Sequence, residues 1–408
     1  MTTDATTNAA LSPVEPAAST LITIEQELNA MFLEREQAIR EIFVCLLARQ
    51  HCVLIGDPGT GKSALVEEIC ARVSDPQGNG LQLFTYLMTK FTQVEEIFGP
   101  VSFAGIKNET YHRVIAGRLP EAEIAFLDEI WKPTSAILNT LLKIINERRF
   151  NNGVDIIDVP LMCMYGASNE LPEGNDLGAI RDRFLLTHFV GHLSRSNREL
   201  LMLRKAGLEP DPWKSPKTRI GRDELLALQE YILTIPFTRP VIAAKAAIVD
   251  ELTKEGIVIS ERRDGQCQPL MQAHALLEGR DAVNEDDLVI LYDAFWMEPG
   301  QIPTVTRVIN QHSNPTNARA SELKDQADTI YAQTLATMEA IKQDRSKRLL
   351  AASEGAGKLE AIKQELEDLQ NQAQRSNTST KRVEQAVVSV SKQYADLLTN
   401  VGFKGLKA

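Results

Sequence analysis

The 408-residue sequence has no long apolar run, no excess of positive charge and only five cysteines. Because no stretch approaches the roughly 18 apolar residues that a membrane-spanning helix needs, we expect no membrane span. The first twenty residues contain neither a basic region nor an apolar segment, which argues against a signal peptide or a membrane anchor. The net charge of −11 argues against nonspecific binding to nucleic acid or to anionic lipid.

The cysteines are odd in number, and no two of them have the two-residue spacing of zinc knuckles or redox motifs. This pattern predicts free, buried thiols in a reducing cytosol, and therefore a cytoplasmic protein. The residues concerned are Cys45, Cys52, Cys70, Cys163 and Cys267.

The chain is too long for a single hydrophobic core, and its 43% hydrophobic and 24% charged residues are typical of soluble globular proteins. Small polar residues at the start predict a mobile tail, and proline and asparagine before residue 317 predict a linker. The expected parts are a tail at 1–19, an α/β domain at 20–192, an all-α domain at 193–297, a linker at 298–316 and a helical tail at 317–408.

Short apolar runs alternate with helical patterns in the first 190 residues. Between Leu21 and Gln50 the apolar positions recur at three- and four-residue intervals, as in an amphipathic helix. Alternating strands and helices favour a parallel sheet covered by helices, so the sequence predicts an α/β fold, an αβα sandwich. The predicted strands are Cys52–Ile55, Leu81–Met88, Ile124–Leu127 and Leu161–Ala167, with helices such as Ala64–Val73 and Ser135–Asn146 between them.

The remainder of the chain is predicted to be helical. Positions from Ile362 to Val401 alternate four- and three-residue steps, which is typical of a coiled-coil heptad seam, although polar residues such as Ser376 and Thr380 weaken it in the middle. Asn377–Thr380 is expected either to interrupt one long helix or to turn a hairpin, and Glu354–Gly357 is expected to be a second break. In the second domain the helical runs are Arg222–Leu233, Val241–Glu255 and Leu270–Glu278.

A glycine-rich segment follows the first predicted strand and opens a helix. It fully matches the phosphate-binding loop pattern in the context that the pattern requires. Its glycines let backbone amides face phosphates, Lys62 can reach the β and γ oxygens, and the Ser63 hydroxyl can coordinate Mg²⁺. The expected ATP-binding residues are Gly56, Asp57, Pro58, Gly59, Thr60, Gly61, Lys62, Ser63 and Ala64.

Two acids end the predicted strand Ile124–Leu127. Asp128 is placed to bind the metal and Glu129 to polarise an attacking water, so this segment predicts hydrolysis as well as binding. An apolar run that ends in two acids can also be a strand entering a helix cap. The position of Asp128, 66 residues after Lys62 in the same predicted sheet, favours the catalytic interpretation.

Polar and basic residues after the later strands are further candidates. Asn169 can orient the water or contact the γ-phosphate, although it can also be a turn residue. Arg181 or Arg183 can reach the γ-phosphate of a neighbouring subunit, which requires a ring. Arg262 or Arg263, behind the helix cap Ser260, can face the nucleotide across a domain interface. Exposed, salt-bridged arginines are the structural alternative.

Together these segments resemble an AAA+ ATPase. More specifically, four strings are similar to the MoxR group, and closest to its RavA branch. They are YLMTKFTQVEEIFGPVS (Tyr86–Ser102), LPEAEIAFLDEIWK (Leu119–Lys132), AILNTLLKIINERRF (Ala136–Phe150) and ASNELPEG (Ala167–Gly174). The resemblance is strong over residues 25–190 and continues more weakly to residue 297.

The resemblance implies a P-loop NTPase fold with an all-α lid, and a Mg²⁺-dependent ATPase that forms a homohexamer. It implies Lys62 and Ser63 as Walker A, Asp128 and Glu129 as Walker B, Asn169 as sensor 1, Arg183 as arginine finger and Arg262 as sensor 2. It also implies a helix-2 insertion at Phe98–Arg118 and a hairpin at Phe150–Val159, both facing a pore or partner. By composition, the first of these is only a glycine-flanked hairpin candidate.

The end of the chain departs from the RavA pattern. RavA-like proteins carry a small β-rich module within a helical stalk that engages a lysine decarboxylase. Residues 319–408 show helical periodicity and almost no strand pattern, so that partner is not expected and only the stalk is. By analogy with the group, a von Willebrand factor A (vWA) domain protein is an expected partner.

The sequence therefore favours a ring ATPase that remodels a protein client and binds no nucleic acid. One alternative is a DNA motor, since replicative helicases share the helix-2 insertion. The acidic body and the lack of a basic patch interleaved with aromatic residues argue against it. The other alternative is a scaffold that binds ATP to assemble, with little turnover and with the heptad tail as its working surface.

Overall fold

The computed structural model describes residues 14–75, 77–107, 110–171, 178–313, 315–341, 345–375 and 381–400. These residues form two compact units. The first contains the described residues up to 238 together with 258–297, and the second contains 239–257 together with the described residues from 298 onward. No helix within these ranges is long and apolar enough to cross a membrane.

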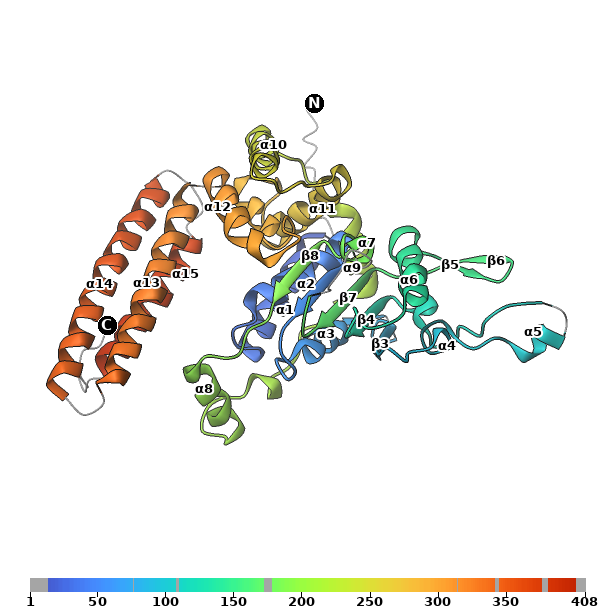
Figure 1. Ribbon diagram of the computed structural model, residues 1–408, viewed down its shortest axis with the longest axis horizontal. Helices are drawn as coiled ribbons and strands as arrows, with labels where there is room; N and C mark the ends of the chain where they lie inside the picture. The colour runs from blue at the N-terminus through green and yellow to red at the C-terminus, as the bar shows by residue number, and fades with distance from the viewer. Residues whose placement is uncertain are drawn as a thin grey trace, which may run out of the picture. The chain divides into compact units, whose positions relative to one another are not determined.

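The first unit is built on a five-stranded parallel sheet with the strand order β3-β4-β7-β1-β8 (Figure 1). Strands β1, β4 and β7 are almost entirely buried, as expected for a parallel sheet covered on both faces. The predicted α/β fold is thus confirmed, although the fifth strand was not predicted. The strands are β1 Cys52–Ile55, β3 Leu83–Leu87, β4 Ile124–Asp128, β7 Cys163–Ser168 and β8 Leu186–Phe189.

The helices of the first unit are amphipathic and bury their apolar sides. Ile137, Leu141 and Ile144 of α6 are fully buried against Ala125 and Leu127 of β4, at the spacing of one helix face. The helices are α1 Val14–Met31, α2 Glu36–Ala48, α3 Lys62–Ala71, α4 Val94–Phe98, α5 Phe103–Lys107, α6 Ser135–Glu147, α7 Gly178–Arg181, α8 Arg195–Lys205, α9 Arg222–Ile232 and α11 Glu261–Leu277. Shorter 3₁₀ turns are η1 Leu119–Glu121, η3 Pro212–Lys214 and η4 Glu285–Leu291. Small strands are β2 Val73–Ser74, parallel to β9 Ile220–Gly221, and β5 Arg149–Asn152, antiparallel to β6 Asp155–Asp158.

Two boundaries of the first unit differ from the sequence expectation. Helix α1 begins at Val14, so the described part of the expected 1–19 tail, residues 14–19, is helical. Ala17 begins the apolar stripe that continues in Leu21 and is already buried, which explains the earlier start. The expected 193–297 domain is also not a separate body, because α9 and α11 pack against α1 and α2.

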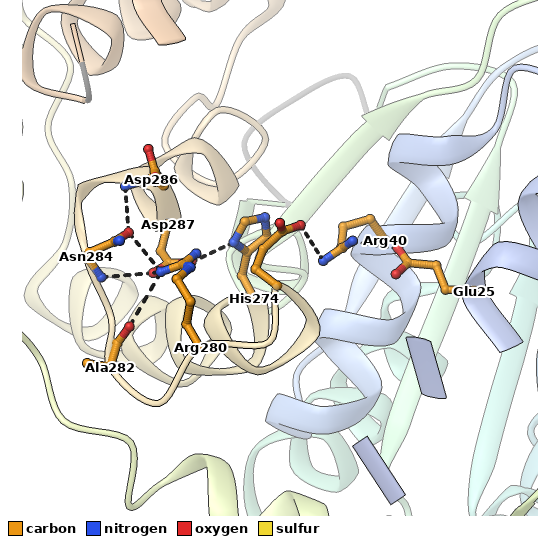
Figure 2. A network of polar contacts seen from close by, with 9 residues as sticks. Glu25, Arg40, His274, Arg280, Ala282, Asn284, Asp286 and Asp287 are labelled. Atoms are coloured by element: carbon orange, nitrogen blue, oxygen red, sulfur yellow. Dashed lines mark hydrogen bonds and ion pairs between the residues drawn. The ribbon is translucent and has the colours of Figure 1, made fainter. Parts of the chain in front are cut away.

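An ion-pair network joins α11 to α1 and α2 (Figure 2). Arg40 of α2 pairs with Glu25 of α1 at 2.6 Å and with Glu278, just after α11, at 3.0 Å. The three side chains are largely buried, so the network fixes the end of α11 against the two N-terminal helices.

The same network continues to the fully buried Asp287 of η4, which pairs with Arg280 through two contacts of 2.6 Å and with His274 at 2.7 Å. Burial would raise the pKa of Asp287, but the hydrogen bonds from His274 and Arg280 outweigh it and lower that pKa. We therefore expect Asp287→Ala to lower the free energy of unfolding by about 3 kcal/mol, because Arg280 would lose its charged partner.

Urea denaturation of the full chain measures this loss, with Asp281→Ala as the matched control. Asp281 is an exposed acid six residues earlier in the same segment. Equal stability of the Asp287 variant and the control would show that the buried pair contributes nothing.

Helices are the only secondary structure in the described residues of the second unit. Its helices are α10 Arg239–Lys254, α12 Ile302–His312, α13 Pro315–Ala340, α14 Arg345–Arg375 and α15 Lys381–Asn400, and the 3₁₀ turn η5 spans Pro299–Gln301. Arg307 of α12 forms ion pairs with Glu251 and Glu255, at 3.3 and 3.0 Å. The prediction of a linker at 298–316 is wrong for most of its length, because η5 and α12 occupy residues 299–312. Val305, Val308 and Ile309 bury one face of α12 at helical spacing.

Helices α13, α14 and α15 lie side by side and share one apolar core (Figure 1). Leucine, isoleucine and valine side chains of α14 and α15 lie in this core, namely Leu359, Ile362, Leu366, Val390 and Leu397. The residues of the predicted heptad pattern therefore pack against helices of the same chain. Because α14 and α15 contact each other along their length, the chain reverses between them; the turn segment Asn377–Thr380 lies outside the described residues.

The expected break at Glu354–Gly357 is wrong, since α14 runs through it without interruption. A Cβ atom added at Gly355 would lie 2.4 Å from Oγ1 of Thr334. Glycine at this position thus allows α13 and α14 to approach closely, and it marks helix packing rather than a turn.

All five cysteines are buried and free, as the sequence predicted. Burial raises the pKa of the Cys70 thiol to about 12, and it raises the pKa values of Cys45 and Cys163 well above the usual range. These thiols are therefore protonated at neutral pH and shielded from solvent.

Glu41 of α2, His188 of β8 and Asp293 form a buried cluster. Nδ1 of His188 lies 2.8 Å from Oδ2 of Asp293 and 3.4 Å from Oε1 of Glu41, which also accepts a hydrogen bond from Gln37. Burial, and then the charge of Asp293, raise the pKa of Glu41 to about 8. Burial alone would lower the pKa of His188, but Glu41 and Asp293 outweigh it and raise that pKa to about 10.

Both raised pKa values mean that the folded state binds these protons more tightly than the unfolded chain. Their stabilisation is complete below the unfolded values of 4.5 for Glu41 and 6.5 for His188, and it is lost as pH rises through about 8 and about 10. We expect the melting temperature to fall by at least about 4 °C between pH 7 and pH 10. Glu41→Gln should remove the step near pH 8, whereas Glu36→Gln on the exposed side of α2 should keep it. Superimposable pH profiles of the two variants would contradict this assignment.

Candidate active site

The glycine-rich loop lies between β1 and α3, at the carboxyl edge of the sheet. A Cβ atom at Gly56 would lie 2.3 Å from the Val190 carbonyl oxygen, so only glycine allows this close approach to the chain after β8. Gly59 and Gly61 have φ angles of +81° and +88°, and apart from their chain neighbours no heavy atom lies within 4 Å of where a Cβ would lie. The loop backbone is therefore unobstructed, as binding of an anion by its amides requires.

Lys62, the first residue of α3, is directed back toward this loop. Its Nζ donates to the carbonyl oxygens of Gly56 and Asp57, at 2.5 and 3.1 Å. Burial lowers the pKa of the Lys62 ammonium, while Asp128, Glu129 and Asp57 counteract that shift. The structure thus brings the lysine and the two predicted acids into one electrostatic environment.

The strand register places the polar residues at the same edge. Asp128 of β4 is paired with Ala167 of β7, and Ser168 of β7 is paired with Ile55 of β1, directly before the loop. Glu129 and Asn169 follow these strands, and Asn169 Nδ2 donates to Oε1 of Glu129 at 2.8 Å. The sheet therefore brings together Glu129 and Asn169, which are 40 positions apart in the chain.

Glu129 is held in an unusual conformation. It has a φ angle of +54°, which residues other than glycine rarely adopt, and its side chain is largely buried. Lys132 Nζ lies 3.1 Å from its second carboxylate oxygen, so Asn169 and Lys132 hold one oxygen each. The strained backbone and the two contacts fix the position of this carboxylate.

A cavity of about 360 Å³ lies beside the loop. Arg35 supports it by donating to the carbonyl oxygens of Thr60 and Gly191, at 3.3 and 2.8 Å. The side chains of Phe32 and Trp213 meet edge to face, with ring centroids 5.0 Å apart. The other lining residues are Met31, Leu33, Gly59, Gly61, His192, Leu193, Arg198 and Leu201. This mainly apolar cavity next to a phosphate-binding loop suits the base of a nucleotide, and the sequence patterns did not indicate it.

The two arginine segments meet elsewhere in the first unit. Arg183 and Arg262 line a second cavity, of about 240 Å³, together with Arg49, His51, Asn146 and Arg148. No residue of the loop Gly56–Ser63 lines this cavity. Arg183 and Arg262 therefore line one cavity, and the phosphate-binding loop of the same chain does not line it.

The alternative arginines have structural contacts. Arg263 is 3% exposed and donates to the carbonyl oxygens of Ala294 and Leu185, at 2.5 and 2.7 Å. Arg181 stacks over the ring of Trp296, with its guanidinium carbon 5.4 Å from the ring centroid. Neither Arg263 nor Arg181 lines the second cavity, whereas Arg262 and Arg183 do.

The two expected insertions project on the same side of the first unit (Figure 1). The hairpin β5–β6 is present, whereas the described residues between 98 and 118 contain the short helix α5 and an isolated bridge between Val101 and Arg113. Asn152 of the hairpin exchanges two hydrogen bonds with the Arg113 backbone, at 2.6 and 3.1 Å. The insertions therefore support each other, and their apolar side chains Phe103 and Val154 are 84% and 96% exposed.

The residues present fit a nucleoside triphosphate and a divalent cation. The unobstructed loop and Lys62 suit the phosphates, and the cavity suits the base. Asp128 and the half-buried Ser63 offer the oxygen ligands that Mg²⁺ prefers.

Comparison with known proteins extends these observations. Residues 19–230 match the family described as the MoxR domain in the MoxR-vWA-beta-propeller ternary systems, and residues 240–309 match an AAA lid domain. Two uncharacterised proteins of Methanocaldococcus jannaschii are similar. MJ0812 is 35% identical over 91% of this chain and 98% of its own length. MJ0079 is 39% identical over 75% of this chain and 77% of its own length. The crystal structure of a candidate ATPase from Cytophaga hutchinsonii shares the fold, with a TM-score of 0.58, 14% identity and coverage of 72% of this chain and 96% of that one.

Proposed function

The chain belongs to the MoxR family of AAA+ ATPases, and we propose that it hydrolyses ATP in a ring to remodel a protein client. The observation that carries this proposal is the convergence of Lys62, Asp128, Glu129 and Asn169 at one edge of the sheet. Membership in an ATPase family supports hydrolysis, and the geometry supplies a role for each residue.

Within one subunit, the loop amides and Lys62 would bind the phosphates. Ser63 and Asp128 would hold Mg²⁺, which neutralises phosphate charge when it is bound. Glu129 accepts a proton from the attacking water, and Asn169, which already contacts Glu129, orients that water. Phe32 and Trp213 would exclude water from the base.

A second subunit would complete the site. Arg183 and Arg262 lie apart from the loop of their own chain, which fits a role at the γ-phosphate of a neighbour. A homohexamer would supply such neighbours around the ring. The exposed apolar side chains of the two insertions would contact the client.

The family description supports a vWA domain partner, which we propose for this chain as well. We also propose that the chain is closest to the RavA branch of the family, on the basis of the four strings quoted above. The helical bundle α13–α15 would then serve as a stalk.

Phosphate release and molar mass, measured together with and without Mg²⁺-ATP, test the proposal directly. We expect assembly and phosphate release for the wild-type chain, and neither for Lys62→Ala. A wild-type chain that stays monomeric and releases no phosphate, alone or with a vWA protein, would rule the proposal out. Assembly without turnover would favour the scaffold alternative instead.

A further inference from the structure

Asn146, near the end of α6, connects the two arginines of the second cavity. Nε of Arg183 donates to Oδ1 of Asn146 at 2.7 Å, and Nη2 of Arg262 donates to the same oxygen at 2.6 Å. Arg183 follows α7, whereas Arg262 lies in the first turn of α11. One amide oxygen, with both of its lone pairs used, therefore ties two distant segments to α6.

This arrangement keeps two positive charges close together. Arg183 pairs with Asp182 at 2.7 Å, while Nε of Arg262 makes only a long contact, 3.4 Å, with the neutral Gln266. Burial lowers the pKa of Arg262, the charge of Arg183 lowers it further, and Asp182 counteracts both. Like charges at this range repel, and the shared acceptor is neutral, so it orients both guanidinium groups without cancelling either charge.

We infer that Asn146 is a positioning residue for ATP hydrolysis in the neighbouring subunit, where it presents Arg183 and Arg262 as one unit to the γ-phosphate. The inference rests on the proposed function. Aspartate would offer the same acceptor geometry, but its charge would pair with both arginines and compete with the phosphate. Asparagine positions the pair without adding a negative charge of its own that would compete with an anion.

The test compares Asn146→Ala and Asn146→Asp with the matched variants Asn151→Ala and Asn151→Asp. Asn151, on β5, is also an exposed asparagine whose side-chain oxygen accepts a bond from Lys143 at 2.7 Å, and it is not among the residues that line the second cavity. Both Asn146 variants should lower kcat by about 10-fold or more, while the ATP affinity of the subunit and the circular dichroism spectrum stay unchanged. Both Asn151 variants should have wild-type kcat.

Mixed rings separate a role in trans from a local defect. An Asn146→Ala subunit keeps its own phosphate loop, so a Lys62→Ala neighbour with intact arginines should restore turnover at that loop. Failure of this mixture, where Arg183→Ala mixed with Lys62→Ala does recover, would overturn the inference. Wild-type kcat in Asn146→Asp would overturn it as well. If Arg183→Ala itself keeps full turnover, the proposed role in trans fails; if only the Asn146 variants are fully active, this inference alone fails.

Discussion

Glu129→Gln should lower ATP turnover by about 100-fold or more and leave ATP binding intact, because the amide cannot accept a proton from water. The substitution keeps an oxygen that can accept the hydrogen bond from Asn169, so the local structure should persist. Steady-state phosphate release and the equilibrium binding of a fluorescent ATP analogue measure the two effects separately.

Glu147→Gln is the control for this variant, since Glu147 is an exposed acid at the end of α6. Its turnover should equal that of the wild type. Unchanged turnover in Glu129→Gln would refute the role of general base, and lost ATP binding would indicate a structural role instead.

Arg183→Ala should abolish most of the turnover, by about 1000-fold if the arginine stabilises transition-state charge as arginine fingers do. Mixing it with Lys62→Ala should recover activity, because each subunit would contribute the half-site that the other lacks. A titration of one variant into the other, followed by phosphate release, should show a maximum at an intermediate ratio.

Arg181→Ala is the matched control two residues away, since Arg181 stacks on Trp296. It should retain substantial turnover, with any loss appearing in thermal stability. A fully active Arg183→Ala ring would exclude the finger assignment, and a mixture whose activity merely adds the two parents would argue against complementation.

The phosphate-binding loop and the acids could be predicted from sequence because each signal is local. Gly56–Ser63 is a contiguous motif whose backbone conformation demands glycine, and Asp128 and Glu129 end an uninterrupted apolar strand. The contact between Glu129 and Asn169 was not predicted, but topology explains it, because parallel strands end at one edge.

Strand β8 and the cavity beside the glycine-rich loop had no local sequence signal. Leu186-Thr-His-Phe189 is only four residues long and is polar at its centre, where His188 meets Glu41 and Asp293. Phe32 and Trp213 meet across more than 180 residues, and no periodicity links them. Asn146 likewise had no sequence signal, since its two hydrogen bonds come from arginines of α11 and of the segment after α7.

The glycine at 355 shows how a composition signal can mislead. Two glycines in four residues indicate a turn when the chain is read alone, yet one of them fits against Thr334 inside a helical bundle. Whether a glycine breaks a helix or lets two helices touch depends on the neighbour, which the local sequence does not contain.

The burial of every native sulfhydryl has a practical consequence. A maleimide dye added to the folded protein should leave these five positions unlabelled, so a single new cysteine at the exposed position 154 would carry the label alone. Motion of the β5–β6 tip during nucleotide turnover can then be followed by fluorescence in a chain that retains all its original residues but one.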